Sequence, residues 1–220
     1  MTLRALSLLE TRVLGVLVEK QHTVADSYPL SLNSLVLGCN QKTARDPVIA
    51  ASDSDVLGAV DELKSLSLVV EVSGSRVSRY EHNAQRVLGV PSQSVAILAL
   101  LMLRGPQTAA ELRASTERLH RFADISSVEA FLDELAAREP PLVVKLVRAP
   151  GARESRWMHL VGGPVAMVDA AAADAPAGSD AVAAGEWSAL KANQARLEAE
   201  VAALREQVAR LASELGVVLD

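Results

Sequence analysis

One short stretch of this chain occurs twice. Residues Val60–Leu63 (Val-Asp-Glu-Leu) recur as Leu132–Leu135 (Leu-Asp-Glu-Leu). Each copy is predicted to form the middle of a helix that leads into an apolar strand and then into a second, basic strand. Self-similarity of this kind indicates that one structural unit is repeated. The repeat therefore favours folds built from two copies of a small domain.

The first copy is predicted to contain three helices and a hairpin. A capping box begins the first helix at Ser7, and Ser31 and Ser52 are suitable caps for the second and third helices. Apolar residues at helical spacing follow each cap. Beyond them, the β-rich residues 68–72 and 76–82 flank a Gly-Ser turn, which predicts two antiparallel strands.

The second copy repeats this order. The apolar residues 95–103 predict its first helix. Thr108 and Ser126 are each followed three residues later by Glu, which predicts capping boxes for the second and third helices. Residues 142–147 and 153–161 are predicted to form its hairpin. Three helices followed by a hairpin is the order of a winged helix.

These patterns predict an α+β fold that is mainly helical. We expect two tandem winged-helix domains, at residues 1–88 and 89–163. Residues 164–185 are mostly Ala, Gly, Asp and Pro and are predicted to form a flexible linker, with a partly helical stretch as the alternative. Residues 186–220 are predicted to contain a coiled-coil helix and the C-terminal end.

The predicted coiled coil pairs two chains. Its apolar residues repeat every seven positions, with Leu at d and mainly Val at a, a pattern that favours two parallel helices. The sequence therefore predicts a parallel homodimer, and the alternative is a helix that folds back onto its own domains. The predicted dimer seam consists of Trp187, Leu190, Gln194, Leu197, Val201, Leu204, Val208, Leu211 and Leu215.

Three segments of the two copies resemble one protein family. They are YPLSLNSLVLGCNQKTARDPV at residues 28–48, LRGPQTAAEL at residues 103–112 and RESRWMHL at residues 153–160. Together they are similar to the YceH-like family of uncharacterised bacterial proteins over residues 6–162, with Trp157 at a position where that family is expected to have Tyr. The resemblance implies a tandem winged-helix fold. It implies no activity, so function is argued from the residues.

Composition and motifs argue against several classes of protein. A single cysteine, Cys39, allows no intrachain disulfide and favours a reducing compartment, so we expect a cytoplasmic protein. The longest apolar run, residues 95–103, is far shorter than the ~20 residues that a membrane-spanning helix needs, so we expect no membrane partner. The four histidines lack the spacing of metal ligands, and the glycines form no phosphate-cradling loop. We therefore expect no enzymatic activity, no metal and no cofactor, and we expect Cys39 to pack in the core.

The predicted third helices are poor candidates for reading DNA. A winged helix ordinarily places this helix in the major groove. Both copies are rich in Asp and Glu here, and phosphates repel these side chains. Long connections, at residues 40–51 and 115–125, precede the third helices, whereas a DNA-reading helix-turn-helix uses a turn of about 3 to 4 residues.

Basic residues elsewhere favour contact with phosphates. The net charge of −5 lies in the tail, so the two copies together are nearly neutral and charge must be judged patch by patch. Two classes of function stay open. One is binding of double-stranded DNA as a dimer in a regulatory role, and the other is a protein-protein adaptor similar in outline to the winged-helix accessory subunits of chromosome segregation. The candidate nucleic-acid contacts are Lys42, Arg45, Arg113, Arg118, Arg121, Lys145, Arg148, Arg153 and Arg156.

Overall fold

The fold is α+β and mainly helical. A computed structural model describes residues 3–72, 77–148, 151 and 154–164. The first half of this region contains, in chain order, α1 (Leu8–Thr23), the short 3-10 helix η1 (Ala25–Ser27), β1 (Leu30–Ser31), α2 (Leu32–Cys39), α3 (Asp53–Ser65), β2 (Val69–Val72), β3 (Arg79–His82) and α4 (Ala84–Leu88). The second half contains α5 (Ser92–Arg104), α6 (Ala109–Thr116), α7 (Ile125–Ala136), β4 (Val143–Lys145) and β5 (Trp157–His159).

Most of the predicted helix starts are confirmed. Ser7, Ser52 and Thr108 each accept a hydrogen bond from the backbone N–H three residues later, within complete capping boxes. Ser31 caps α2 in the same way through its hydroxyl. These side chains satisfy backbone donors that have no partner inside the helix, so they fix where each helix begins.

The predicted start of α7 at Ser126 is wrong. The helix begins at Ile125, and its cap is Asp124, whose Oδ1 accepts from the N–H of Ser127 at 2.7 Å. The same oxygen accepts from the Ser127 hydroxyl at 2.6 Å. Asp and Ser are comparable caps, and Asp124 lies at the position from which a carboxylate reaches this N–H. Ser126 therefore lies inside the first turn.

The two copies share details of strand pairing as well as element order. In the first sheet, whose strand order is β1-β3-β2, Leu30 pairs with Tyr80. In the second copy Gln107 forms an isolated bridge with Trp157. Leu30 and Gln107 each lie directly before the cap of the following helix. The bridge at Gln107 therefore corresponds to β1, which the sequence did not predict.

The hairpins also share their register. Val69 of β2 pairs with His82 of β3, and Val143 of β4 pairs with His159 of β5. Each histidine thus lies two residues after the aromatic residue of its strand. Among the described residues, the strands of both hairpins are shorter than the sequence predicted, although the backbone hydrogen bonds of Leu146 to Arg156 and of Leu160 to Leu142 extend the second hairpin beyond them. The two hairpins thus carry an aromatic residue and a histidine at matching positions, Tyr80 and His82 in the first and Trp157 and His159 in the second.

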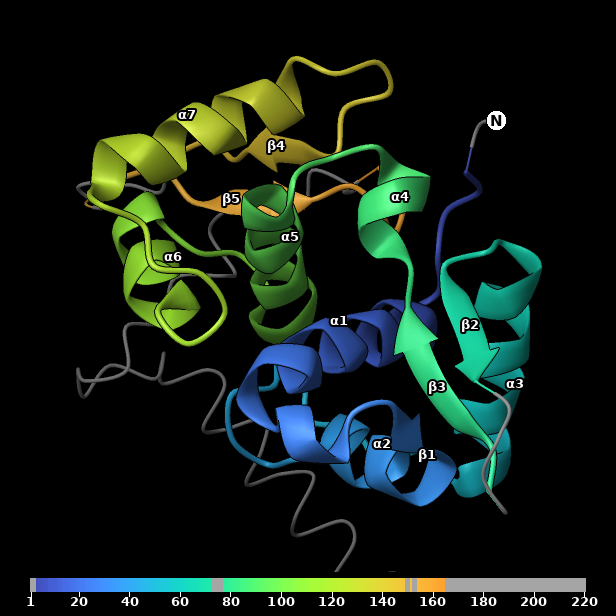
Figure 1. The fold of residues 1–220 in the computed structure, drawn as a ribbon. Coiled ribbons are helices and arrows are strands. Elements are labelled where there is room, and N and C mark those ends of the chain that lie inside the picture. The colour runs from blue at the N-terminus through green and yellow to red at the C-terminus, as the bar shows by residue number, and fades with distance from the viewer. Residues whose placement is uncertain (1–2, 73–76, 149–150, 152–153, 165–220) are drawn as a thin grey trace, which may run out of the picture. The chain divides into compact units, whose positions relative to one another are not determined.

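The first helix of each copy packs against the other. Figure 1 shows α1 and α5 crossing at the centre, with α2, α3 and the first sheet on one side and α6, α7 and the second hairpin on the other. Residues 10–18 of α1 and 94–103 of α5 are buried without interruption. A helix that is buried all round must be covered on two faces, and each of these helices is covered by its own copy and by the other one.

A glycine allows this close crossing. A Cβ atom at Gly15 of α1 would lie 2.9 Å from Cγ of Leu103 and 3.3 Å from the carbonyl oxygen of Ala99, both in α5. Real Cβ atoms do not tolerate the shorter of these distances, so the backbone of α1 approaches α5 only because no side chain intervenes.

Backbone hydrogen bonds add to the junction between the copies. The N–H of Leu6 donates to the carbonyl of Val161 at 2.9 Å, and the N–H of Asp46 donates to the carbonyl of Leu103 at 2.8 Å. The buried apolar residues of both copies form one continuous cluster. The described residues therefore belong to one compact unit, within which the expected boundary after residue 88 falls at the end of α4.

Cys39 is buried, which confirms that it packs in the core. Burial disfavours the thiolate and raises the pKa of Cys39 to about 12. Within the described part of the chain, no helix is both long and apolar enough to cross a membrane. Most of the predicted linker and all of the predicted coiled coil lie outside the described residues.

Candidate nucleic-acid interface

The nine basic residues predicted to contact nucleic acid occupy different surroundings. Arg45 is buried and Arg156 is half-buried, whereas Arg153 lies outside the described residues. The exposed members of the set are Lys42, Arg113, Arg118, Arg121, Lys145 and Arg148.

Arg45, one of the candidate contacts, is buried and holds other parts of the chain. Its guanidinium is fully buried, and Nη2 lies 2.6 Å from the carboxylate of Glu19 in α1. Its Nε donates to the carbonyl of Gly38 at 3.1 Å, and Nη2 also donates to the side chain of Gln41 at 2.7 Å. Burial opposes ionisation of Glu19, but the hydrogen bond and charge of Arg45 outweigh it, so the pKa of Glu19 is lowered. These contacts use the donors that a phosphate would need.

A second buried arginine, which the sequence did not predict, holds the same connection. Arg12 of α1 is fully buried and donates to the carbonyls of Cys39 at 3.2 Å and Pro47 at 2.6 Å. The side-chain amide of Asn40 closes the connection by two hydrogen bonds to the backbone of Ala51. Burial lowers the pKa of Arg12, and the nearby charge of Arg45 lowers it further. The long connection between α2 and α3 is therefore fixed against α1 rather than free to track a ligand.

The exposed basic residues of the second copy are differently placed. Arg113 of α6 donates to the carbonyl of Ala123 at 3.1 Å, across the connection that leads to α7. Arg118 and Arg121 are exposed in that connection, and the ammonium of Lys145 lies 5.3 Å from the centre of the Trp157 ring. Arg148 is exposed just beyond β4, and none of these five residues forms an ion pair with any residue that the structure describes.

Arg156 differs from these five because it has partners. Its Nη1 donates to the carbonyl of Pro106 at 2.9 Å, and its Nη2 lies 3.2 Å from the carboxylate of Glu111 in α6. The residue therefore ties the start of β5 to the start of α6. Its charge is already partly compensated.

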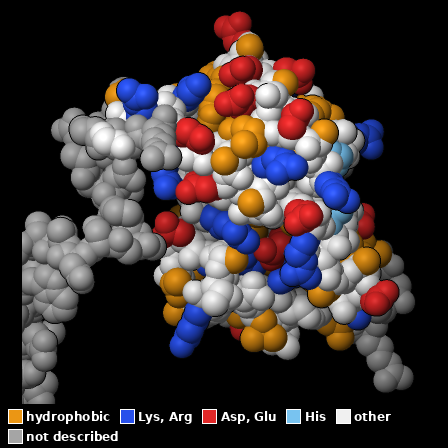
Figure 2. All heavy atoms as spheres, turned by 90° about the vertical axis from the view of Figure 1, so that its left-hand side faces the viewer, with side chains coloured by type: hydrophobic (Ala, Val, Ile, Leu, Met, Phe, Trp, Pro, Cys, Tyr) orange, Lys and Arg blue, Asp and Glu red, His pale blue; other side chains and the backbone are white. Residues whose placement is uncertain are grey.

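The third helices of both copies present acidic surfaces, as the sequence predicted. Figure 2 shows the face of the molecule that carries α6 and α7, with basic side chains across its middle and acidic side chains gathered toward the α7 end at the top. The exposed carboxylates of α3 and α7 are those of Asp53, Asp55, Asp61, Glu62, Glu129, Asp133 and Glu134. Neither helix is suited to lie against phosphates.

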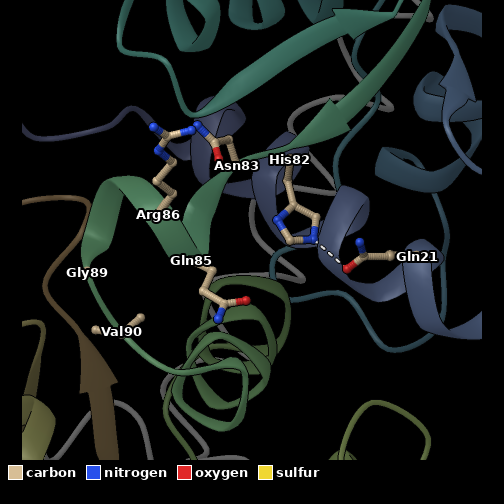
Figure 3. Close-up of a pocket in the computed structure, with 7 residues that line it drawn as sticks. All are labelled: Gln21, His82, Asn83, Gln85, Arg86, Gly89 and Val90. Atoms are coloured by element: carbon tan, nitrogen blue, oxygen red, sulfur yellow. Dashed lines mark hydrogen bonds between the residues drawn. The ribbon is translucent and has the colours of Figure 1, made fainter.

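A polar hollow lies where the first copy leads into the second. Its volume is about 510 Å³, and it is bounded by the end of α1, the end of β3, and α4 with the residues that follow it. Figure 3 shows the ring of His82 pointing toward Gln21, with Gln85 and Arg86 carried by α4. The lining residues are Gln21, His82, Asn83, Gln85, Arg86, Gly89 and Val90.

The hydrogen bonds of His82 define its protonation. Its Nδ1 accepts from the N–H of Ala84 at 3.4 Å, so Nε2 carries the proton and donates to Oε1 of Gln21 at 2.8 Å. Burial lowers the pKa of His82 to about 4, helped by the charge of His22. The ring is therefore neutral at physiological pH.

Comparison with known proteins places the chain in a family. The model of the DUF480 family, described as proteins of unknown function, matches residues 6–152. The chain belongs to the DUF480/UPF0502 family. It is 75% identical over 217 residues to a UPF0502 protein from Methylibium petroleiphilum, covering 99% of this chain and 93% of the relative. It is 66% identical over 218 residues to one from Burkholderia orbicola, covering 99% of this chain and 92% of the relative.

The family confirms part of what the sequence resemblance implied. The chain belongs to a family of uncharacterised bacterial proteins, as expected, and the DUF480 match includes both long connections. Because neither family description states an activity, function in this DUF480 chain has to follow from its geometry. The exposed basic residues could be predicted from the sequence, but the burial of Arg12 and Arg45 could not. The only sequence signal for Arg12 is the apolar run at residues 13–18 that directly follows it.

Proposed function

We propose that this chain is a non-enzymatic protein of two winged-helix modules that binds the phosphate backbone of double-stranded DNA with its second module. The observation that supports this most is the group of five exposed basic side chains around α6 and β4, none of which is paired with a carboxylate of the described residues. We name this group the basic set; it consists of Arg113, Arg118, Arg121, Lys145 and Arg148. Unpaired cations at a surface are what release counterions from DNA.

The proposed contact is to the backbone and not to the bases. The exposed carboxylates of α7 would be repelled from a groove lined with phosphates, which leaves the connection before α7 and the hairpin after it as the contacting segments. Contacts from such segments position a protein on a duplex without reading its sequence. We therefore expect binding that is strongly salt-dependent and weakly sequence-dependent.

The test is a salt titration of duplex binding, measured by fluorescence anisotropy. The full-length protein should lose affinity as salt rises, and a plot of log affinity against log salt concentration should have a slope of about −0.9 for each phosphate neutralised. Replacing Arg118 and Arg121 by Gln should flatten this slope by about one unit per lost contact, and so should replacing Lys145 and Arg148. The same titration of Lys42→Gln tests whether the first module also contacts the phosphate backbone.

The matched control is Arg86→Gln, which removes an exposed arginine outside the basic set. It should leave the slope unchanged. Glu134→Gln, on the exposed side of α7, should leave binding unchanged or strengthen it slightly by removing repulsion. Absence of salt-sensitive binding at low ionic strength, or equal slopes for the wild type and both double variants, would rule out this proposal.

A second candidate is a protein-protein adaptor. The acidic third helices of both modules are exposed, and so are two apolar side chains of the first module, Leu37 at 65% and Val48 at 56%. Exposed apolar and acidic surface of this kind suits a protein partner better than it suits DNA. Affinity purification from native cells with and without nuclease separates the two functions, because only a protein partner is retained after the nucleic acid is removed.

A further inference from the structure

The hollow between α1, β3 and α4 carries one net positive charge. Arg86 is the only charged residue among the seven that line it, because His82 is neutral and the remaining side chains are amides or apolar. The Arg86 guanidinium makes no hydrogen bond or ion pair with any described residue, so its donors are available to a ligand. A guanidinium presents five N–H donors in a geometry that matches carboxylate and phosphate.

The other lining groups favour a polar ligand. Val90 is the only apolar side chain among the lining residues, whereas three others, Gln21, Asn83 and Gln85, are amides. The volume of about 510 Å³ falls within the range of small-molecule sites, which is roughly 300 to 1,000 Å³.

The corresponding place in the second copy is closed. His159 occupies the same register position as His82, but it packs near Gly162, beside the segment where Leu6 pairs with Val161. His159 is buried there, whereas His82 is only half-buried. The same strand pairing therefore occurs with a buried histidine in the second copy, so the strand pairing alone does not create the hollow beside His82.

We propose that this hollow binds a small polar anion, such as a phosphorylated or carboxylated metabolite, with Arg86 supplying the positive charge and neighbouring amides supplying hydrogen bonds. The ligand would contact the last turn of α1 together with α4 and the residues that lead into α5. This site is separate from the basic set and does not depend on DNA binding.

The experiment uses the full-length, ¹⁵N-labelled protein and two matched probes. Glycerol 3-phosphate carries the charge, and glycerol is its neutral counterpart at the same ionic strength. We expect saturable shifts of the backbone amides of Gly89 and Val90 and of the Gln21 side-chain amide with glycerol 3-phosphate only.

Variants distinguish this site from the proposed DNA site. Arg86→Gln should weaken binding about tenfold or more, because it removes a charge-assisted hydrogen bond, and Arg86→Lys should recover part of the affinity. Arg118→Gln, in the basic set, should leave binding in the hollow unchanged. Unchanged spectra of residues distant from the hollow verify that the Arg86 variants are folded.

Three results would overturn the proposal. They are shifts that do not saturate, equal shifts with glycerol, and equal affinity of the wild type and Arg86→Gln. Saturable shifts confined to the basic set would also contradict it, while supporting the phosphate contact proposed for DNA.

Discussion

Two equivalent histidines link the stability of the protein to pH. Burial lowers the pKa of His159 to about 4, as it does for His82. An unfolded histidine has a pKa near 6.5, so as pH falls the unfolded chain takes up protons before the folded chain does. Stability conferred by each neutral ring is therefore present above pH 6.5 and is lost between about pH 6.5 and 4.

We predict that the free energy of unfolding decreases when the pH is lowered from 7 to 5. Each histidine should contribute about 1 to 2 kcal/mol to this decrease. Urea unfolding at both pH values measures it, and His82→Gln and His159→Gln should each reduce the pH dependence. His120→Gln, in the connection after α6, is the control. Equal stability of the wild type at both pH values would contradict the buried, neutral state of the two rings.

Substitution of two basic residues in the connection between α2 and α3 should change stability to different extents. Arg45→Ala leaves Glu19 without its main counter-charge, although Lys20 stays 3.2 Å away. We expect a loss of about 2 to 3 kcal/mol in urea unfolding, near the lower end for breaking a buried ion pair. Lys42→Ala, at an exposed position three residues earlier, should change stability by less than about 0.5 kcal/mol. Similar effects of the two substitutions would mean that Arg45 is not a structural residue.

Two glycines within helices test the crossing of α1 and α5. Gly58 of α3 has open space where a Cβ would lie, so Gly58→Ala should stabilise the protein by about 0.5 to 1 kcal/mol through helix propensity. Gly15→Ala gains the same propensity but forces Leu103 and α5 apart, and such overpacking costs about 1 to 3 kcal/mol. We therefore expect a net loss of stability at Gly15. Thermal unfolding of both variants measures the difference, and stabilisation by both would contradict the close approach.

Helix starts could be predicted from the sequence because capping depends on a few neighbouring residues. Ser7, Ser31, Ser52 and Thr108 all cap the helices they were expected to cap. The error at Ser126 arose because two suitable caps stand close together, and the choice between them depends on where the preceding connection places the backbone. Elements such as β1 and α4 are too short to show a period, and they form because a partner strand or the other copy lies beside them.

The candidate sites were less predictable than the helices. The residue types of the basic set follow from the sequence, but whether an arginine faces solvent depends on contacts between distant segments. Arg45 illustrates this, since its partner Glu19 lies 26 residues earlier in the chain. The hollow was not predicted at all, because it is lined from three separate elements and no local pattern connects them.

The predicted dimer seam lies in residues 187–215, which are outside the described residues. The heptad pattern predicts a parallel homodimer, and Leu197→Lys with Leu204→Lys would place two charges per chain in the seam, where burial is unfavourable. Sedimentation should then show monomers. A wild-type chain that is already monomeric at micromolar concentration would exclude the dimer. A dimer would carry two copies of the basic set, so its DNA binding should depend more steeply on salt concentration than that of a monomer.

The shared burial of α1 and α5 bears on how the protein is made. During synthesis α1 emerges first, but α5 follows only after roughly 70 further residues, several seconds later at about 5 to 20 residues per second. Until then, the face of α1 around Gly15 that α5 will cover stays in contact with water and with other nascent chains. We therefore expect the growing N-terminal half to expose apolar surface of α1 until α5 has been made, and a chain that stops between α4 and α5 to leave that surface uncovered.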